Sequence, residues 1–163
     1  NGFAYASRNS HKTRLPVKEL FSLLIGRAQR VHGGHQVCLE GLTPAQLRQV
    51  ALTAIKFLNH KGLHFTYRSA RSFYADNTLP HRPDKSTKLR WLTRASTHPS
   101  LAVILYIENQ RIIHWSILKS VAGDRVRLFD SDALTQVSVD AVRIFACIQH
   151  LDQSKTESAK NDQ

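Results

Sequence analysis

The chain has 163 residues, of which 42% are hydrophobic, and its 23 lysines and arginines against 12 acids give a formal charge of +11. This length suits a single domain with a real core. No apolar run approaches the ~20 residues needed to cross a bilayer, and residues 1–15 are too polar and basic for a signal peptide. We therefore expect a soluble, cytoplasmic protein whose positive charge favours an anionic partner, such as nucleic acid, a membrane surface or an acidic peptide.

The first half of the chain predicts two amphipathic helices and a strand. Residues 16–30 place apolar side chains at helical spacing after a proline, and the sequence HGGH breaks the pattern. A second helix is expected from Pro44, with Thr43 as N-cap and Gln46 completing a capping box, until Gly62 ends it. The sequence LHFTYRS that follows alternates like a strand with one face toward solvent.

The second half of the chain predicts mainly strands. Residues 71–87 carry two prolines and an Asp-Asn pair, which is typical of a long irregular loop. A short helix is expected over residues 86–97. The clearest strands cover residues 100–107, 111–121 and 125–129. Because only tight turns separate these strands, they should form an antiparallel meander.

The end of the chain is less regular in pattern. Residues 133–150 fit either further strands or one helix. From residue 152 onward there is no apolar residue except one alanine, so residues 152–163 are expected to form a disordered tail. The patterns together predict a single α+β domain over residues 1–151, with helices first and an antiparallel sheet afterwards.

The sequence HWSILKSVAGDRVRLFDSD, residues 114–132, predicts a hairpin that opens with a histidine and closes with two aspartates. If AGD forms the turn, residues whose numbers sum to about 246 face one another, which places His114 opposite Asp132 and Ser116 opposite Asp130. A carboxylate that accepts one ring N–H fixes the imidazole tautomer and leaves the other nitrogen as a base. Histidines and aspartates also flank strands for structural reasons, and a register slip of one residue would separate the pair.

Residues 101–130 resemble the C-terminal half of papain-like cysteine peptidases of the bacteriocin-processing, double-glycine-leader type. The shared pattern is an apolar strand, a second strand that begins with His114 and Trp115, a Gly-Asp turn, and a third strand that ends at Asp130, sixteen positions after the histidine. The resemblance implies a papain-like fold, a bacterial source, a peptide or protein substrate and no cofactor. It also implies that His114 is general base and acid, Asp130 its orienter, Asp132 the fallback orienter, and Trp115 a wall of the site.

The nucleophile of that family has no counterpart in the sequence. In the family the catalytic cysteine starts a helix and is followed by glycine and small residues, an oxyanion-hole glutamine precedes it, and the same helix continues into a segment much like residues 1–24. The resemblance therefore implies that the nucleophile was either cut away from the N-terminus of this chain or lost. In both cases the chain is expected to be inactive as given, because a His-Asp pair without a thiolate only orients and shuttles protons.

Neither cysteine of the chain replaces the missing nucleophile convincingly. Cys38 follows the first long helix, whereas the family places its cysteine before it, and Cys147 has the surroundings of a core residue. Neither lies in a metal-type or disulfide-type cluster, so free thiols are expected. His32 and His35 of the HGGH sequence have no further ligand at a recognisable spacing, so no metal is expected.

The main alternative is a basic domain that binds single-stranded DNA or RNA without catalysis. Between residues 56 and 94, cations alternate with aromatic side chains, and these are the groups that neutralise phosphates and stack on bases. The predicted contacts are Arg68, Arg71, Lys88, Arg90 and Arg94. The same mixture also fits a solvated face over core aromatics, and no recognition-helix or RNA-binding signature accompanies it.

Overall fold

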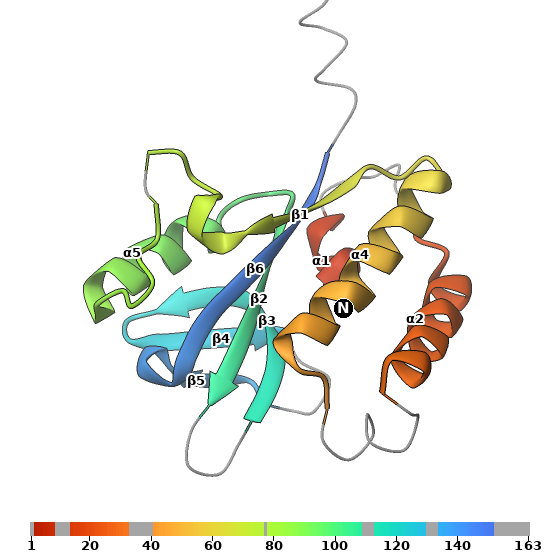
Figure 1. Ribbon diagram of the computed structural model, residues 1–163. Coiled ribbons are helices and arrows are strands. Elements are labelled where there is room, and N and C mark those ends of the chain that lie inside the picture. Colours follow the sequence, from red (N-terminus) through yellow and green to blue (C-terminus); the bar gives the residue numbers. More distant parts are fainter. Residues whose placement is uncertain are drawn as a thin grey trace, which may run out of the picture. The chain divides into compact units, whose positions relative to one another are not determined.

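A computed structural model describes residues 2–8, 14–32, 41–76, 78–108, 113–129 and 134–151 (Figure 1). The chain divides into two compact units. Unit 1 contains Asn1–His11 and Arg68–His150, and unit 2 contains Lys12–Tyr67 and Leu151–Gln163. The described residues combine helices with an antiparallel sheet, which confirms the expected α+β class.

Unit 2 contains two helices that pack on one another, α2 (Val17–His32) and α4 (Pro44–His60), and both confirm the predictions. The backbone N–H of Thr43 donates to Gln46 Oε1 at 2.6 Å, as a capping box requires. Gly62, at φ 78°, follows the helix in the left-handed region that favours glycine. The helix α4 buries Val50, Ala51, Ala54, Ile55 and Leu58 along one stripe.

The strand β1 (Phe65–Ser69) leads from unit 2 into unit 1 and is shorter than the predicted LHFTYRS. The side chain of Asn59 holds its start, because Nδ2 donates to the Phe65 carbonyl at 3.1 Å and the Phe65 N–H donates to Oδ1 at 2.8 Å. The predicted loop that follows begins with a single 3-10 turn, η1 (Ala70–Ser72), and ends at the helix α5 (Lys85–Ser96).

The sheet has the strand order β1-β6-β2-β3-β4-β5. The strands β2 (Leu101–Glu108), β3 (Ile113–Ala122) and β4 (Arg125–Phe129) form the predicted antiparallel meander. Successive antiparallel neighbours of this kind need only short connections, which is why the local sequence pattern reveals them.

Residues 133–150, which fit either strands or one helix, contain β5 (Gln136–Ser138), a 3-10 turn η2 (Val139–Ala141) and β6 (Val142–His150). β5 extends the meander by pairing with β4. β6 instead pairs antiparallel with β2, so the last strand lies between elements that precede it by many residues. Its apolar residues Ala146, Cys147 and Ile148 are buried, and they pair with three residues of β2 that are buried as well.

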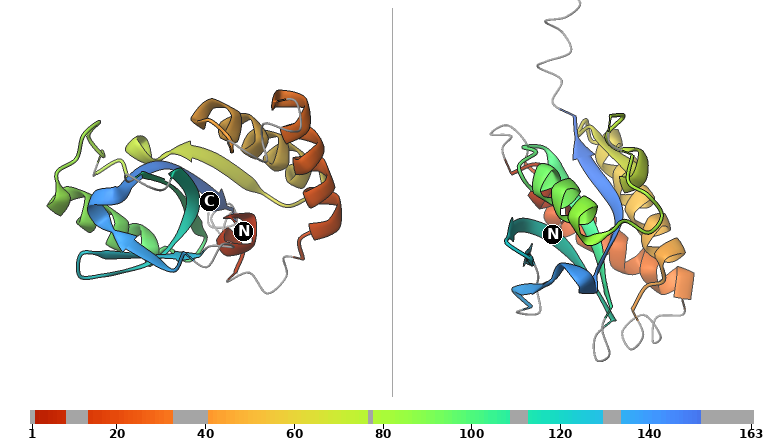
Figure 2. Two further views of the ribbon diagram at one scale, coloured as in Figure 1. Left: turned by 90° about the horizontal axis from the view of Figure 1, so that it is seen from below. Right: turned by 90° about the vertical axis from the view of Figure 1, so that its left-hand side faces the viewer.

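Both faces of β2 are buried. One row of its side chains, Leu101, Val103, Leu105 and Ile107, is at most 1% exposed. This row belongs to a core with Trp91, Leu92 and Ala95 of α5. The helix α1 (Gly2–Ala6) contacts the opposite face, as the left view of Figure 2 shows.

The first helix does not continue as the family resemblance implies. α1 ends at Ala6, and residues 14–16 are not helical, so α2 is a separate helix that starts at Val17. Pro16 precedes α2, and proline removes a backbone donor that an uninterrupted helix would need. α1 is therefore shorter than the resemblance implies, and the separate helix predicted from Pro16 is α2.

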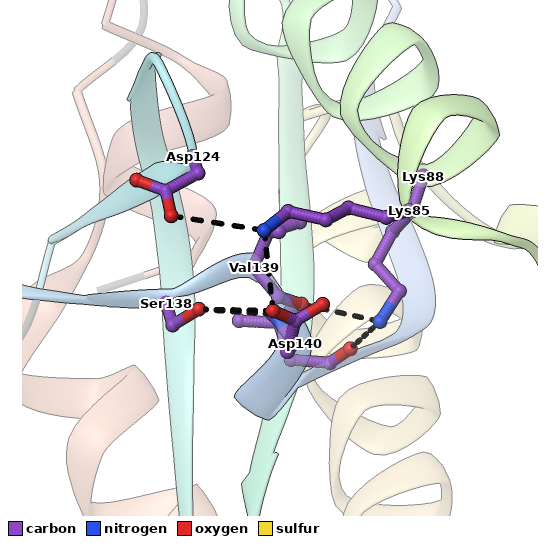
Figure 3. A network of polar contacts seen from close by, with 7 residues as sticks. Lys85, Lys88, Asp124, Ser138, Val139 and Asp140 are labelled. Carbon is purple, nitrogen blue, oxygen red and sulfur yellow. Dashed lines mark hydrogen bonds and ion pairs between the residues drawn. The ribbon is translucent and has the colours of Figure 1, made fainter.

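Two lysines near the start of α5 bind the β5–β6 region of unit 1 (Figure 3). Lys88 Nζ donates to the carbonyls of Val139 at 3.1 Å and Val142 at 2.9 Å. Burial lowers the pKa of the Lys88 ammonium from its usual value. Lys85 is more exposed and pairs with Asp140 at 3.3 Å. Lys88 is thus a structural cation.

We predict that Lys88→Met lowers the free energy of unfolding by about 1–3 kcal/mol, because two partly buried carbonyls lose their donor. The control, Lys85→Met, removes only exposed ion pairs, which are worth about 0–1 kcal/mol. Urea denaturation of both variants and the wild type at pH 7 measures the difference. Equal losses in the two variants would contradict the structural role of Lys88.

Candidate functional site

The hairpin of β3 and β4 has the register that the sequence predicts. Ile117 pairs with Phe129 and Leu118 pairs with Leu128, and the residue numbers of both pairs sum to 246. A β-bulge after Leu118 shifts the pairing by one residue nearer the turn. Gly123 lies in that turn at φ 60°, a conformation that favours glycine.

His114 lies near the start of β3 and is partly buried. Its partner on β2 is Ile107, a core residue. Because side chains alternate along a strand, His114 shares a face with Ser116 and Leu118, the face that α5 covers. Ile117 lies in the other row.

The start of α1 lies against the row of Ile117. A Cβ placed on Gly2 would come within 3.3 Å of the Cδ1 atoms of Ile117 and Ile148, so glycine permits this close approach. His114 therefore lies in the row of the sheet that faces away from the start of α1.

The two predicted orienting carboxylates, Asp130 and Asp132, lie outside the described residues. The structure places the strand that leads to them, because β4 ends at Phe129. The register described above thus reaches the position directly before Asp130.

Ser116 is a buried polar residue in the same row as His114. It is 5% exposed, and its Oγ has no hydrogen-bond partner among the residues that the structure describes. An unsatisfied buried hydroxyl costs about 1–3 kcal/mol, so such a group in a native protein needs a specific explanation, such as a catalytic role or a bound water. The sequence placed Ser116 in the hairpin but gave no signal that its hydroxyl would be unpaired.

Trp115 belongs to an aromatic group on the face opposite His114. Its ring centroid lies 4.9 Å from that of Tyr106 and 5.0 Å from that of Phe145. Phe145 falls where the pairing of β6 with β2 shifts by one residue, and a bulge of this kind re-aims a side chain. These ring contacts therefore pack the start of β3 against side chains of β2 and β6.

The thiol of Cys147 is unsuited to nucleophilic attack. Cys147 is fully buried in β6, and burial raises the pKa of its thiol to about 12. The thiol is therefore protonated at neutral pH, whereas the reactive form is the thiolate. Cys38 and His35 lie outside the described residues, as does the side chain of His32. Among the side chains that the structure describes, no group of three or more His, Cys, Asp or Glu could hold a metal ion.

The cations predicted to bind nucleic acid have different surroundings. Arg94 bonds both carboxylate oxygens of Asp76, at 3.0 and 3.1 Å, and its guanidinium lies 3.9 Å from the centroid of the Tyr74 ring. The hydrogen bond from Arg94 lowers the pKa of the Asp76 carboxyl. Arg68 lies over the ring of Phe73, at 5.3 Å. Lys88 is engaged by the two carbonyls already described.

Arg71 and Arg90 are exposed, and neither has an acidic partner in the described part of the chain. The aromatic residues between these cations are less available. Trp91 is 0% exposed and Phe73 is 8% exposed, so both belong to the core rather than to a stacking surface. Within the described residues, two of the five predicted cations thus have no side-chain partner, and none of the rings between these cations is fully exposed.

Comparison of the chain with protein-family models, curated proteins and solved structures gives no match. None of the described helices combines the length and apolar character that crossing a bilayer requires.

We predict that Cys147 is inert to thiol reagents in the folded protein. In a Cys38→Ser variant Cys147 is the remaining cysteine, and with a pKa near 12 its thiolate fraction at pH 8 is about 10⁻⁴. Dithionitrobenzoate at pH 8 should therefore react with this variant only after guanidinium is added. Rapid reaction of one equivalent without denaturant would show that the thiol is accessible.

Proposed function

We propose that the chain is a cysteine peptidase-like or amidase-like domain with a papain-like fold. In this proposal His114 accepts and donates the proton, and Asp130 orients the imidazole, with Asp132 as the fallback orienter. The single observation that carries the proposal is the register of β3 and β4. An antiparallel ladder in that register pairs position 114 with 132 and position 116 with 130.

The register supports a pair of His114 with a carboxylate because it sets how far each carboxylate lies from the imidazole ring. Cβ atoms of directly opposed residues lie ~4.5–5.5 Å apart and those of diagonal neighbours ~7–8 Å apart. Either carboxylate would then lie within reach of the His114 ring, with Asp132 opposite and Asp130 diagonal to it. Ser116 adds to the same row a hydroxyl that has no partner in the described part of the chain. The order of a helix, an apolar strand and a strand with His114 near its start also supports the family resemblance.

The proposed chemistry follows from the imidazole of His114 and the carboxylate that orients it. The ring N–H nearest the carboxylate donates to it, and the other ring nitrogen accepts a proton from a thiol. The thiolate attacks the carbonyl carbon of a peptide or amide, and the amine leaves with the proton held by His114. Water then releases the acyl group, with His114 again accepting the proton.

None of the described residues supplies the thiolate, because Cys147 is protonated in the core. The described residues therefore contribute only the proton-handling half of the reaction. Without a thiolate beside His114, the same site would bind a peptide without cleaving it. This proposal has more support than nucleic-acid binding, since Lys88 and Arg94 are already engaged within unit 1.

We predict that the His114 ring has one fixed tautomer at pH 8, which long-range ¹⁵N–¹H NMR spectra report directly. Asp130→Ala should convert it to a mixture of both tautomers, because the carboxylate that accepts one N–H is removed. Asp132→Ala is the matched control and should leave the tautomer unchanged. The opposite response would make Asp132 the orienter, and no response to either change would contradict the His-carboxylate pair.

We also predict the effect of His114 on hydrolysis by the protein as it occurs in its source. With peptide amides that end in a double glycine, His114→Ala should lower the rate by about 10²–10⁴-fold, which is the usual contribution of a general base. His81→Ala removes an exposed histidine of unit 1 and should have no effect. Hydrolysis that survives His114→Ala would contradict the assignment, and a wild type that binds but does not cleave these peptides would indicate a binding domain.

A further inference from the structure

The helix α2 of unit 2 has an exposed apolar ridge formed by Val17, Phe21 and Ile25. These side chains are 68%, 65% and 44% exposed. Their spacing of four residues places them along one side of the helix. The side of α2 that packs within the protein carries Leu20 and Ala28, which are buried. The ridge is a separate apolar row that this packing leaves exposed. Clustered exposed apolar side chains of this kind mark an interaction surface.

The charge of the described part of unit 2 is almost entirely positive. Within the described residues of unit 2 the cations are Arg14, Lys18, Arg27, Arg30, Arg48, Lys56 and Lys61. Glu19 is the single acid in the same described stretch, and Lys61 pairs with it at 2.9 Å. Arg14 and Lys18 are exposed and flank Val17 in the sequence. An apolar ridge with cations beside it is the pattern of a helix that lies in a membrane interface.

We propose that α2 docks unit 2 on an anionic lipid surface. Val17, Phe21 and Ile25 enter the boundary between headgroups and acyl chains, while Arg14 and Lys18 bind lipid phosphates. Long basic side chains do this readily, because they can bury their stems and keep the charged end in water. This inference concerns unit 2 and does not depend on the His114 site.

Charge favours a bilayer over a second copy of the chain. Two copies that met through this ridge would bring Arg14 and Lys18 of each against cations of the other, which costs free energy. An anionic bilayer instead attracts the same cations. The ridge itself favours a bilayer over nucleic acid, because phosphates use the cations but leave the three apolar side chains in water.

The test is sedimentation of the full chain with vesicles of phosphatidylcholine alone or mixed equally with phosphatidylglycerol. The wild type should sediment with the mixed vesicles only. Two variants distinguish the contribution of the ridge to binding from the effect of added negative charge. Each replaces one exposed apolar residue with a carboxylate, so the change in charge is the same in both. Phe21→Glu changes the ridge, whereas Leu52→Glu changes a residue of α4 that is 40% exposed. Phe21→Glu should weaken binding about tenfold beyond Leu52→Glu.

Several outcomes would overturn the proposal. Equal weakening by both variants would show that charge alone drives binding, and no sedimentation of the wild type with the mixed vesicles would exclude docking. A dimer that Phe21→Glu dissociates, seen by light scattering in the absence of vesicle binding, would assign the ridge to a second copy. Circular dichroism checks that each variant is folded, and Ile25→Ser is the substitute if Phe21→Glu is not.

Discussion

The fold of unit 1 depends on the burial of β2 on both faces. The row from Leu101 to Ile107 is at most 1% exposed, and Ala102 and Ile104 on the other face are 0% and 5% exposed. Such a strand is stable only when both of its edges are paired and both of its faces are covered. β3 and β6 pair with the edges, and α5 and α1 contact the faces. The positions of the remaining elements of unit 1 follow from this arrangement.

The same constraint fixes the candidate site. Leu118 and Leu128 are paired and both lie in the core, so a slip of one residue would expose them and bury their polar neighbours. The core therefore sets the register that the proposed pairing of His114 with a carboxylate requires. The hydroxyl of Ser116, which has no partner among the described residues, lies in the same row as His114.

Much of the fold could be predicted from local patterns. Three features arise from residues close in sequence: the capping box at Thr43, the meander, and the register of the β3–β4 hairpin. The pairing of β6 with β2 could not be predicted, because it joins distant segments and residues 133–150 fit two structures equally well. The start of α2 could be predicted because Pro16 marks it locally.

The site was predicted less completely than the fold. The sequence identified His114 and its place in the hairpin, but the position of α1 on the row of Ile117 depends on tertiary packing. Lys88 looked like one of several surface cations, since no local pattern shows that two carbonyls surround its ammonium. Trp115 packs with Phe145 only because of a bulge in a distant strand.

The central claim is that a carboxylate after β4 holds the His114 ring. A crystal structure that defines residues 108–134 measures this most directly. The account predicts a carboxylate oxygen of Asp130 or Asp132 within about 2.6–3.2 Å of a ring nitrogen of His114. Both carboxylates directed into solvent, with the ring hydrogen-bonded elsewhere, would contradict it.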